Sequence, residues 1–566
     1  MINRALRTAA SAAAVCGLAL TGCSLGGGGT EGQSSEESPM PAASPGQLVK
    51  VDGFWTDPAI GRPLADMVLE VPQLQAENKD YMARGRFQVL SIDKKGDTAR
   101  LVGAWLQPAE GPALGSMSLG GGVDVLNKEP RITLWDVDSG TLIKPLQTEK
   151  SDRFDKPVSN LYQSMTEETP ANRDKPVELF WVDFPAPSGN SVRVLPGPWT
   201  PPTDPVQVTE GKTYVKEAVD ENAKFSDEPP ADYGDESALR YVDPLVNTTE
   251  MDPNSSLSRF EGGEALNIDA DVLFDFDKDI VNAKGKKVLD STAQKLKEGA
   301  SGQEIALVGH TDAKGSADYN KKLSQRRADA VKKYLDPKVE GADITFKTEG
   351  RGADEPLAPN FDAKGGDIKA NQAKNRRVSF EFRDGSVSGG VSTGQPEKKI
   401  PAVEKTEPAD GALASAVLKV EGAAVGPVRL DIRGISEDGP YTRFDFGFAA
   451  QNPDDASITF FLEPRDSKRV FGLNSYGQIG SPSADHMALV DDEGKVVKPA
   501  QAGGHSCLCS SASPTNVSAG NTPAPLYAMF PTDSLPQGKF KLRIAETGEW
   551  ELDLDELKQK AEEQRN

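Results

Sequence analysis

Histidine, cysteine and aromatic residues are scarce in this chain. Its 566 residues include 3 histidines and 4 cysteines, and 7% of the residues are aromatic. Histidine-dependent chemistry therefore has few places to occur, namely His310, His486 and His505. No spacing typical of a Ser/His/Asp set, a paired-carboxylate site or a His-rich metal site is present. The sequence thus disfavours an enzyme and predicts no cofactor.

Positive charge is also in short supply. Lys and Arg number 64 against 86 Asp and Glu, which gives a formal net charge of −22. Nucleic acid and anionic membrane surfaces would repel such a chain, so neither is an expected partner. The charge is uneven, because residues 266–384 carry 22 basic and 21 acidic side chains. This central part is nearly neutral, and the acidity lies in the segments around it.

Long apolar runs are missing beyond the first 23 residues. No later segment approaches the roughly 18 apolar residues that a membrane-spanning helix needs. At the beginning of the chain, Arg4 and Arg7 precede a short, Ala-rich apolar stretch from Thr8 to Leu20. A charged start followed by an apolar stretch too short to span a bilayer is typical of a secretory signal.

The end of that stretch resembles the lipobox of bacterial lipoproteins, with the residues Leu20-Thr21-Gly22-Cys23. The resemblance implies that residues 1–22 are removed and that Cys23 carries the lipid, including palmitate. Residues 23–47 are rich in Gly, Ser, Glu and Pro, which predicts a flexible tether. We expect a lipid anchor in a cell membrane and a chain facing the periplasm or the extracellular cell-wall space. Whether that membrane is a single membrane or an outer membrane is left open.

Two cysteines remain in the mature chain, Cys507 and Cys509. An oxidising compartment favours pairing them in a local disulfide, although two unpaired loop cysteines also fit the sequence. A soft-metal site built from both thiolates and His505 is the sharper alternative.

Two stretches, 48–203 and 413–552, show the short strands and turns of all-β domains. In both, an Asp-x-Gly turn leads into hydrophobic residues and then Lys-Pro, which predicts two related, sandwich-like copies of one domain. We expect an acidic linker at 204–262, a second linker at 385–412 and a charged tail at 553–566. The matched segments are Arg86-Phe87 with Arg443-Phe444, Asp138–Pro145 with Asp492–Pro499, and Phe180–Pro185 with Leu526–Pro531.

Residues 263–384 alternate strand and helix patterns. The order β-α-β-α-β-β predicts a two-layer α/β domain. Amphipathic patterns predict helices at 283–299 and 317–335. Strands are expected at 270–277, 304–308, 344–348 and 377–382.

The second predicted helix carries a charge on its apolar face. Arg327 lies four residues after Leu323, and Asn320 lies on nearly the same face two turns earlier. A guanidinium on the packing side needs an anionic partner, and Asp312 stands at the end of the preceding strand. Two interpretations fit. Asp312 and Arg327 could form an internal salt bridge, or they could hold the ammonium and the carboxylate of a zwitterion, with Asn320 adding hydrogen bonds.

Four motifs of this region, in this order, resemble the OmpA C-terminal-like peptidoglycan-binding domain. The resemblance covers about 120 residues and implies non-covalent binding of the diaminopimelate residue in uncrosslinked stem peptides. The motifs are Phe274-Asp275-Phe276-Asp277, Val308-Gly309-His310-Thr311-Asp312, the helical segment from Tyr319 to Val331, and Asn375-Arg376-Arg377-Val378.

The resemblance also implies roles for individual residues. Asp312 and Arg327 occupy its two diagnostic ligand positions. Strand parity does not decide which arginine of the last motif points at the ligand. The remaining residues implied to line the pocket are Asp277, Asn320, Leu323, and Arg376 or Arg377.

The sequence therefore predicts a lipid-anchored, non-enzymatic protein that binds peptidoglycan and tethers a membrane to the cell wall. The two β domains would serve as spacers or bind protein partners that the sequence does not identify. Two alternatives stay open: a wall-processing enzyme, and a metal- or redox-handling lipoprotein that uses His505, Cys507 and Cys509.

Overall fold

The computed structural model divides the chain into two compact units, residues 1–42 and 43–566, and every described residue belongs to the second. Among the described residues, no helix is long and apolar enough to cross a membrane. The description covers residues 48–565 apart from 73–81, 114–131, 152–153, 158–175, 198–199, 213, 215–222, 226–227, 235–237, 239, 253, 261–262, 359, 362–365, 383–398, 419–426, 451–483, 485–486, 503–505, 511–522 and 545–547.

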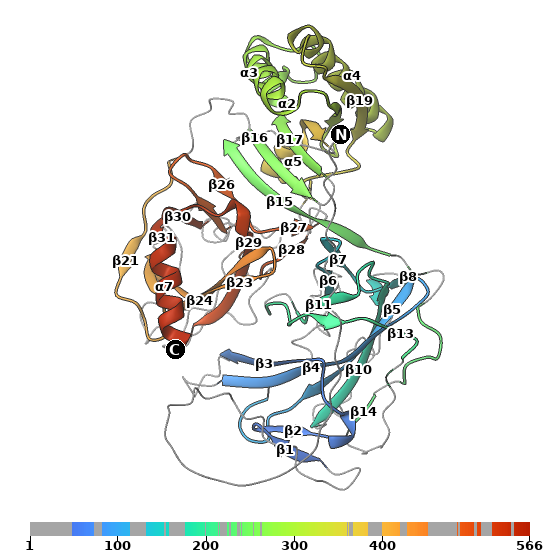
Figure 1. The fold of residues 1–566 in the computed structure, drawn as a ribbon, viewed down its shortest axis with the longest axis vertical. Coiled ribbons are helices and arrows are strands. Elements are labelled where there is room, and N and C mark those ends of the chain that lie inside the picture. The colour runs from blue at the N-terminus through green and yellow to red at the C-terminus, as the bar shows by residue number, and fades with distance from the viewer. Residues whose placement is uncertain are drawn as a thin grey trace, which may run out of the picture. The chain divides into compact units, whose positions relative to one another are not determined.

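The described part of the region before the central domain consists of strands and one short 3-10 helix, Pro58–Ile60 (Figure 1). Its larger sheet has the order β13-β4-β5-β10-β14. Strand β3 also pairs with β4, along an earlier part of that strand than β13 does. Side chains of this sheet and of the smaller β6-β7-β11 group share one buried core. The strands are β1 Val49–Val51, β2 Phe54–Thr56, β3 Ala65–Pro72, β4 Met82–Lys95, β5 Thr98–Leu106, β6 Thr133–Asp136, β7 Thr141–Ile143, β8 Gln147–Ser151, β9 Phe154–Pro157, β10 Val177–Pro185, β11 Ser191–Leu195, β12 Val206–Gln207, β13 Thr209–Glu210 and β14 Ala223–Phe225.

The region after the central domain has a sheet in the order β21-β22-β23-β24-β29. Helix α7 at its end buries Leu554, Leu557 and Ala561 against the core of this region. The elements are β21 Glu404–Thr406, β22 Ala414–Leu418, β23 Val428–Asp438, β24 Tyr441–Ala450, β25 Met487–Val490, β26 Val496–Val497, β27 Gln501–Ala502, β28 Ser506–Cys507, β29 Ala524–Pro531, β30 Lys539–Ile544, β31 Gly548–Asp553 and α7 Leu554–Arg565.

The two flanking sheets follow the same path, because β3-β4-β5-β10 and β22-β23-β24-β29 have the same antiparallel order. In this comparison the segments Phe180–Pro185 and Leu526–Pro531 lie on equivalent strands. The predicted match of Arg86-Phe87 with Arg443-Phe444 is wrong, because the first pair lies on the second strand of its sheet and the second pair on the third. The strand register makes Arg100 the equivalent of Arg443. Arg100 lies opposite Asp183 in the first sheet, and Arg443 lies opposite Met529 in the second.

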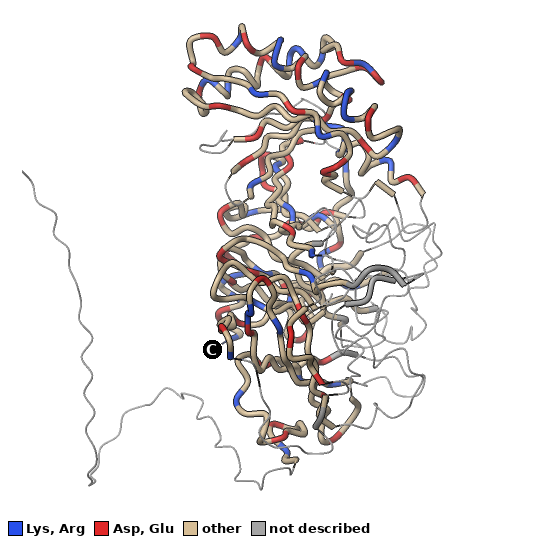
Figure 2. Tube along the Cα trace, turned by 90° about the vertical axis from the view of Figure 1, so that its right-hand side faces the viewer, with Lys and Arg blue, Asp and Glu red and all other residues tan. Residues whose placement is uncertain are grey.

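The central domain is a mixed sheet in the order β16-β17-β20-β18-β19, covered by helices α3 and α4 (Figure 1). Among the described strands of this sheet, β18 and β19 run parallel, and the other neighbouring strands run antiparallel. Basic and acidic residues are interspersed over this domain (Figure 2). Its elements, with the two strands that precede it, are β15 Val242–Asp252, β16 Ser255–Phe260, β17 Gly263–Asp269, α2 Ala270–Leu273, α3 Ala283–Gly299, β18 Glu304–His310, α4 Ala317–Leu335, β19 Thr345–Gly352, α5 Lys369–Asn375 and β20 Arg377–Phe382.

Both long helices begin at side-chain caps. Asn282 accepts a hydrogen bond from the backbone of Gly285 at 2.7 Å, and Ser316 accepts one from Tyr319 at 3.2 Å. Both predicted helices are confirmed with these starts. The strand predicted at 270–277 is wrong, because the strand ends at Asp269 and the short helix α2 follows. The segment predicted as an acidic linker contains β15 and β16, and β16 pairs with β17 of the central sheet.

Candidate functional site

The site lies where the end of strand β18 meets helix α4. Gly309 permits this close approach, since a Cβ at this position would lie 2.1 Å from the backbone oxygen of Ser324. Three residues later the chain presents Asp312. The Asn320 side chain fixes the intervening turn by donating to the backbone oxygens of Asp312 at 3.2 Å and Lys314 at 2.9 Å.

Asp312 forms an ion pair, but not with Arg327. Its Oδ2 accepts from Nη1 of Arg376 at 2.7 Å, and its Oδ1 accepts from the backbone of Lys314 at 3.0 Å. Arg376 also donates two hydrogen bonds to Asp271, at 3.1 and 2.7 Å. These partners raise the pKa of Arg376 above its ordinary value. The interpretation of Asp312 and Arg327 as an internal salt bridge is therefore wrong.

Arg327 is buried to 4% exposure with few partners. Its Nε donates to the backbone oxygen of Lys278 at 2.9 Å, and its guanidinium lies 5.2 Å from the centre of the Phe274 ring. No carboxylate among the described residues forms an ion pair with it. Burial lowers the pKa of Arg327 below its ordinary value, although the charges of Asp271 and Asp277 oppose this. A buried cation without a direct counter-ion is costly, and such a group is often kept for a ligand.

The two arginines of the last motif have different surroundings. Arg376 reaches the site, whereas Arg377 is buried and donates to Ser379, to the backbone oxygen of Asn375 and to that of Glu355. Burial lowers the pKa of Arg377 to about 10. Of this pair, Arg376 is thus the one beside Asp312.

The remaining predicted residues surround the same corner. Leu323 is buried on α4 between Asn320 and Arg327. Asp277 has a left-handed backbone (φ 58°) and accepts a hydrogen bond from the Tyr319 hydroxyl. Phe276 beside it is 94% exposed. Asp271 was not among the predicted site residues, although it stands six residues before Asp277 in the same acidic and aromatic segment.

His310 is buried behind the site at 1% exposure. Neither ring nitrogen has a hydrogen-bond partner among the described residues. Burial, with the charges of Arg377 and Arg351, lowers the pKa of His310 to about 2. The folded protein thus holds a neutral imidazole at any ordinary pH.

We expect His310 to lower the free energy of unfolding in acid. An unfolded histidine binds a proton below about pH 6.5, whereas folded His310 does not until about pH 2. Because the proton binds the unfolded state, the free energy of unfolding falls by about 1.4 kcal/mol for each pH unit between these two values as the pH is lowered. His310→Phe should therefore lose less stability between pH 7 and pH 5 than the parent chain, by about 2 kcal/mol. The free energy of unfolding, followed by the helical circular dichroism signal, measures the difference.

Asp269 changes stability with pH in the opposite direction. Burial raises the pKa of Asp269 to about 7, so its contribution to the free energy of unfolding is lost as the pH rises. Both proteins retain Asp269, so its effect cancels in the comparison. Equal pH dependence of the parent and His310→Phe would show that His310 takes up its proton in the folded state.

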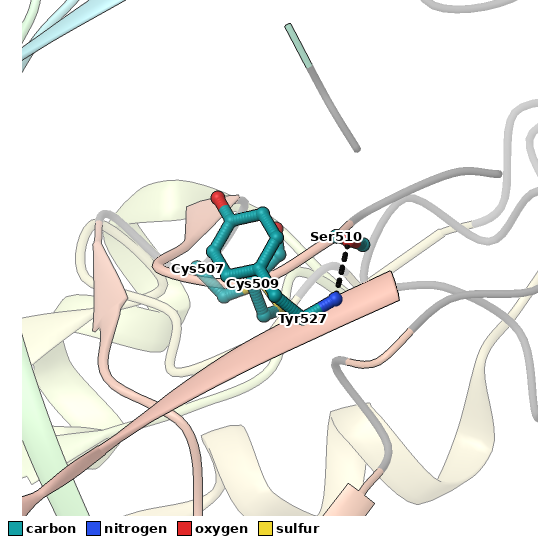
Figure 3. The surroundings of a disulfide bond; sticks show 4 residues. All are labelled: Cys507, Cys509, Ser510 and Tyr527. Carbon is teal, nitrogen blue, oxygen red and sulfur yellow. Dashed lines mark hydrogen bonds between the residues drawn. A yellow bond between two sulfur atoms is a disulfide. The ribbon is translucent and has the colours of Figure 1, made fainter. Parts of the chain in front are cut away.

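Cys507 and Cys509 form a disulfide in the C-terminal region (Figure 3). Both are buried in the core there, close to Tyr527, whose backbone donates to Ser510 at 2.9 Å. Joined sulfur atoms are not thiolate ligands, and no group of three metal-binding side chains occurs among the described residues. His486 and His505 lie outside the described residues.

Comparison with known proteins places the similarity in this central domain. The model of the OmpA family matches residues 273–367. Outer membrane protein A of Bordetella avium is 42% identical over 114 residues, which is 20% of this chain and 54% of that protein, so the chain spans about half the length of this relative. The peptidoglycan-associated lipoprotein of Pseudomonas aeruginosa is 31% identical over 140 residues, 23% of this chain and 77% of that protein.

Among solved structures, the peptidoglycan-associated lipoprotein from Burkholderia pseudomallei is 31% identical. The match covers 20% of this chain and 87% of that one, with a TM-score of 0.16.

Proposed function

The chain belongs to the OmpA family through its central domain, and from the geometry of that domain we propose that it binds peptidoglycan non-covalently. The ligand is the free amino-acid end of diaminopimelate in an uncrosslinked stem peptide. Its ammonium binds Asp312 and its carboxylate binds Arg327. The observation that carries this proposal is the buried Arg327, which has no carboxylate partner of its own among the described residues.

The composition of the site suits a zwitterion. Asp271 and Asp312 share one cation, Arg376, which leaves one negative charge there. Arg327 has the charge of Asp277 nearby but no ion-pair partner among the described residues. Asp312 remains partly exposed and has lone pairs beyond the two that it uses. Asn320 holds the backbone of the turn and so positions Asp312. Asp277 and Tyr319 lie near enough to Arg327 to act on its charge, and Leu323 lies one turn before it on α4.

The wider role in the cell envelope is part of the same proposal. Lipid attached to Cys23 would anchor the chain to a membrane, and residues 23–47 would span part of the distance to the wall. Both lie outside the described residues. The names of the relatives, an outer membrane protein and a peptidoglycan-associated lipoprotein, support a cell-envelope location.

We further infer that the flanking β regions are copies of one domain that share strand β15. This strand pairs with β7 through Val242 and with β26 through Thr249, seven residues later. Strands β7 and β26 are each followed directly by a lysine. Each lysine forms an ion pair with the β15 residue that comes after Val242 or Thr249. Lys144 lies 3.5 Å from Asp243, and Lys498 lies 2.5 Å from Glu250. The copies would act as a joint spacer or as a surface for protein partners.

Sedimentation with isolated diaminopimelate-type peptidoglycan tests the proposal on the full chain. The parent should sediment with the polymer, and Asp312→Asn should bind about 30-fold more weakly or worse, since one side of a desolvated charge contact is lost. Asp336→Asn is the matched control. This carboxylate also accepts from a cation, Lys332, but at the far end of α4. A folded parent chain that stays in the supernatant would contradict the proposal.

A further inference from the structure

Arg376 stands between two carboxylates that come from different elements. Asp271 on α2 receives two of its hydrogen bonds, and Asp312 after β18 receives one. A two-point contact between guanidinium and carboxylate is stronger and more directional than a single one. Asp271 therefore sets the orientation of the guanidinium, and Asp312 meets only its remaining corner.

The charge balance of these three groups matters for the ligand. Asp271, Arg376 and Asp312 sum to one negative charge. With Arg376 and Asp312 alone the sum would be zero, and an incoming ammonium would meet a carboxylate already neutralised by the arginine. Asp271 thus leaves a net negative charge at Asp312. At the other end of the site, Arg327 supplies one positive charge that no described carboxylate pairs directly.

We propose that Asp271 determines the specificity of the site for a free amino-acid end, because it neutralises Arg376 and so leaves a net negative charge at Asp312 for the ligand's ammonium. The inference rests on the proposed function and assigns Asp271 as a positioning residue that acts through Arg376. The favoured ligand class is a zwitterionic α-amino acid end. A ligand that keeps the carboxylate but has an acylated nitrogen is disfavoured.

Removing the Asp271 charge should weaken this preference. In Asp271→Asn the site gains one positive charge, so a purely anionic ligand end loses less affinity than a zwitterionic one. Two muropeptides provide the probes: one with a free diaminopimelate end and the same compound acetylated at that ammonium. The measured quantity is the ratio of their affinities for the purified full chain, by calorimetry. Because it is a ratio, it does not depend on the folded fraction of a variant.

We expect the parent to prefer the free muropeptide and Asp271→Asn to lower that preference about tenfold or more. Adding Arg376→Gln to Asp271→Asn restores the charge balance and should recover much of the preference. Asp336→Asn should keep the parental ratio. An unchanged ratio in Asp271→Asn would overturn the inference while leaving the proposed function intact. A parent chain that binds neither muropeptide would overturn the proposed function and, with it, this inference.

Discussion

Replacing Arg327 with glutamine should lower the affinity of the full chain for peptidoglycan by about 30-fold to several thousandfold, the equivalent of ~2–5 kcal/mol. The guanidinium is buried, so water does not compensate for the lost contact with a ligand carboxylate. Glutamine keeps much of the length and one donor for the backbone oxygen of Lys278, which limits the structural damage. Binding to isolated peptidoglycan, measured over a range of protein concentrations, gives the change in affinity.

The adjacent arginine offers a matched control. Arg326 lies on the same turn of α4, but it is half exposed and pairs with Asp279 at 2.6 Å. Arg326→Gln should change affinity less than about threefold, because an exposed ion pair contributes little. If Arg327→Gln and Arg326→Gln bind equally well, Arg327 does not contact the ligand.

The second large effect concerns stability, at a buried ion pair of the N-terminal β region. Arg100 and Asp183 are 1% and 0% exposed and lie 2.6 Å apart on neighbouring strands. Arg100 also donates to the backbone oxygen of Asp232 and lies against the Tyr233 ring. Arg100→Leu leaves Asp183 buried without its cation, which typically costs about 3–5 kcal/mol.

Chemical denaturation followed by tryptophan fluorescence measures this loss. The central domain contains no tryptophan, so the signal reports on the flanking β regions. Arg84→Leu removes an arginine from the same sheet, where Arg84 and Glu70 form an exposed pair at 2.8 Å. That change should cost about 1 kcal/mol or less. Similar losses in the two variants would mean that Asp183 finds another partner or becomes protonated.

The helices of the central domain were predictable because their information is local. Apolar residues recur at helical spacing, and Asn282 and Ser316 cap the first turns. The same periodicity exposed Arg327 as a charge on a packing face. The strand predicted at 270–277 is the exception. In the fold, Ala270, Val272 and Leu273 are all buried, which a short helix at a sheet corner permits and a half-exposed strand does not.

The counter-ion pattern of the site was beyond sequence reasoning. Asp271, Asp312 and Arg376 are up to 105 residues apart, and only the fold brings them together. The choice between Arg376 and Arg377 failed for a related reason. Helix α5 ends at Asn375, so Arg376 precedes strand β20 and the alternation of that strand does not apply to it. Strand β15 was missed because its polar residues resemble those of a linker.

The carboxylate of the ligand gives the most direct test of whether Arg327 binds diaminopimelate. The affinity of the parent chain for a muropeptide with a free diaminopimelate end should be compared with its affinity for the same muropeptide amidated at that carboxylate. Amidation should weaken binding by about 30-fold or more, because Arg327 then has no anionic group to bind. Equal affinity for both compounds would contradict the proposed pairing of Arg327 with a ligand carboxylate.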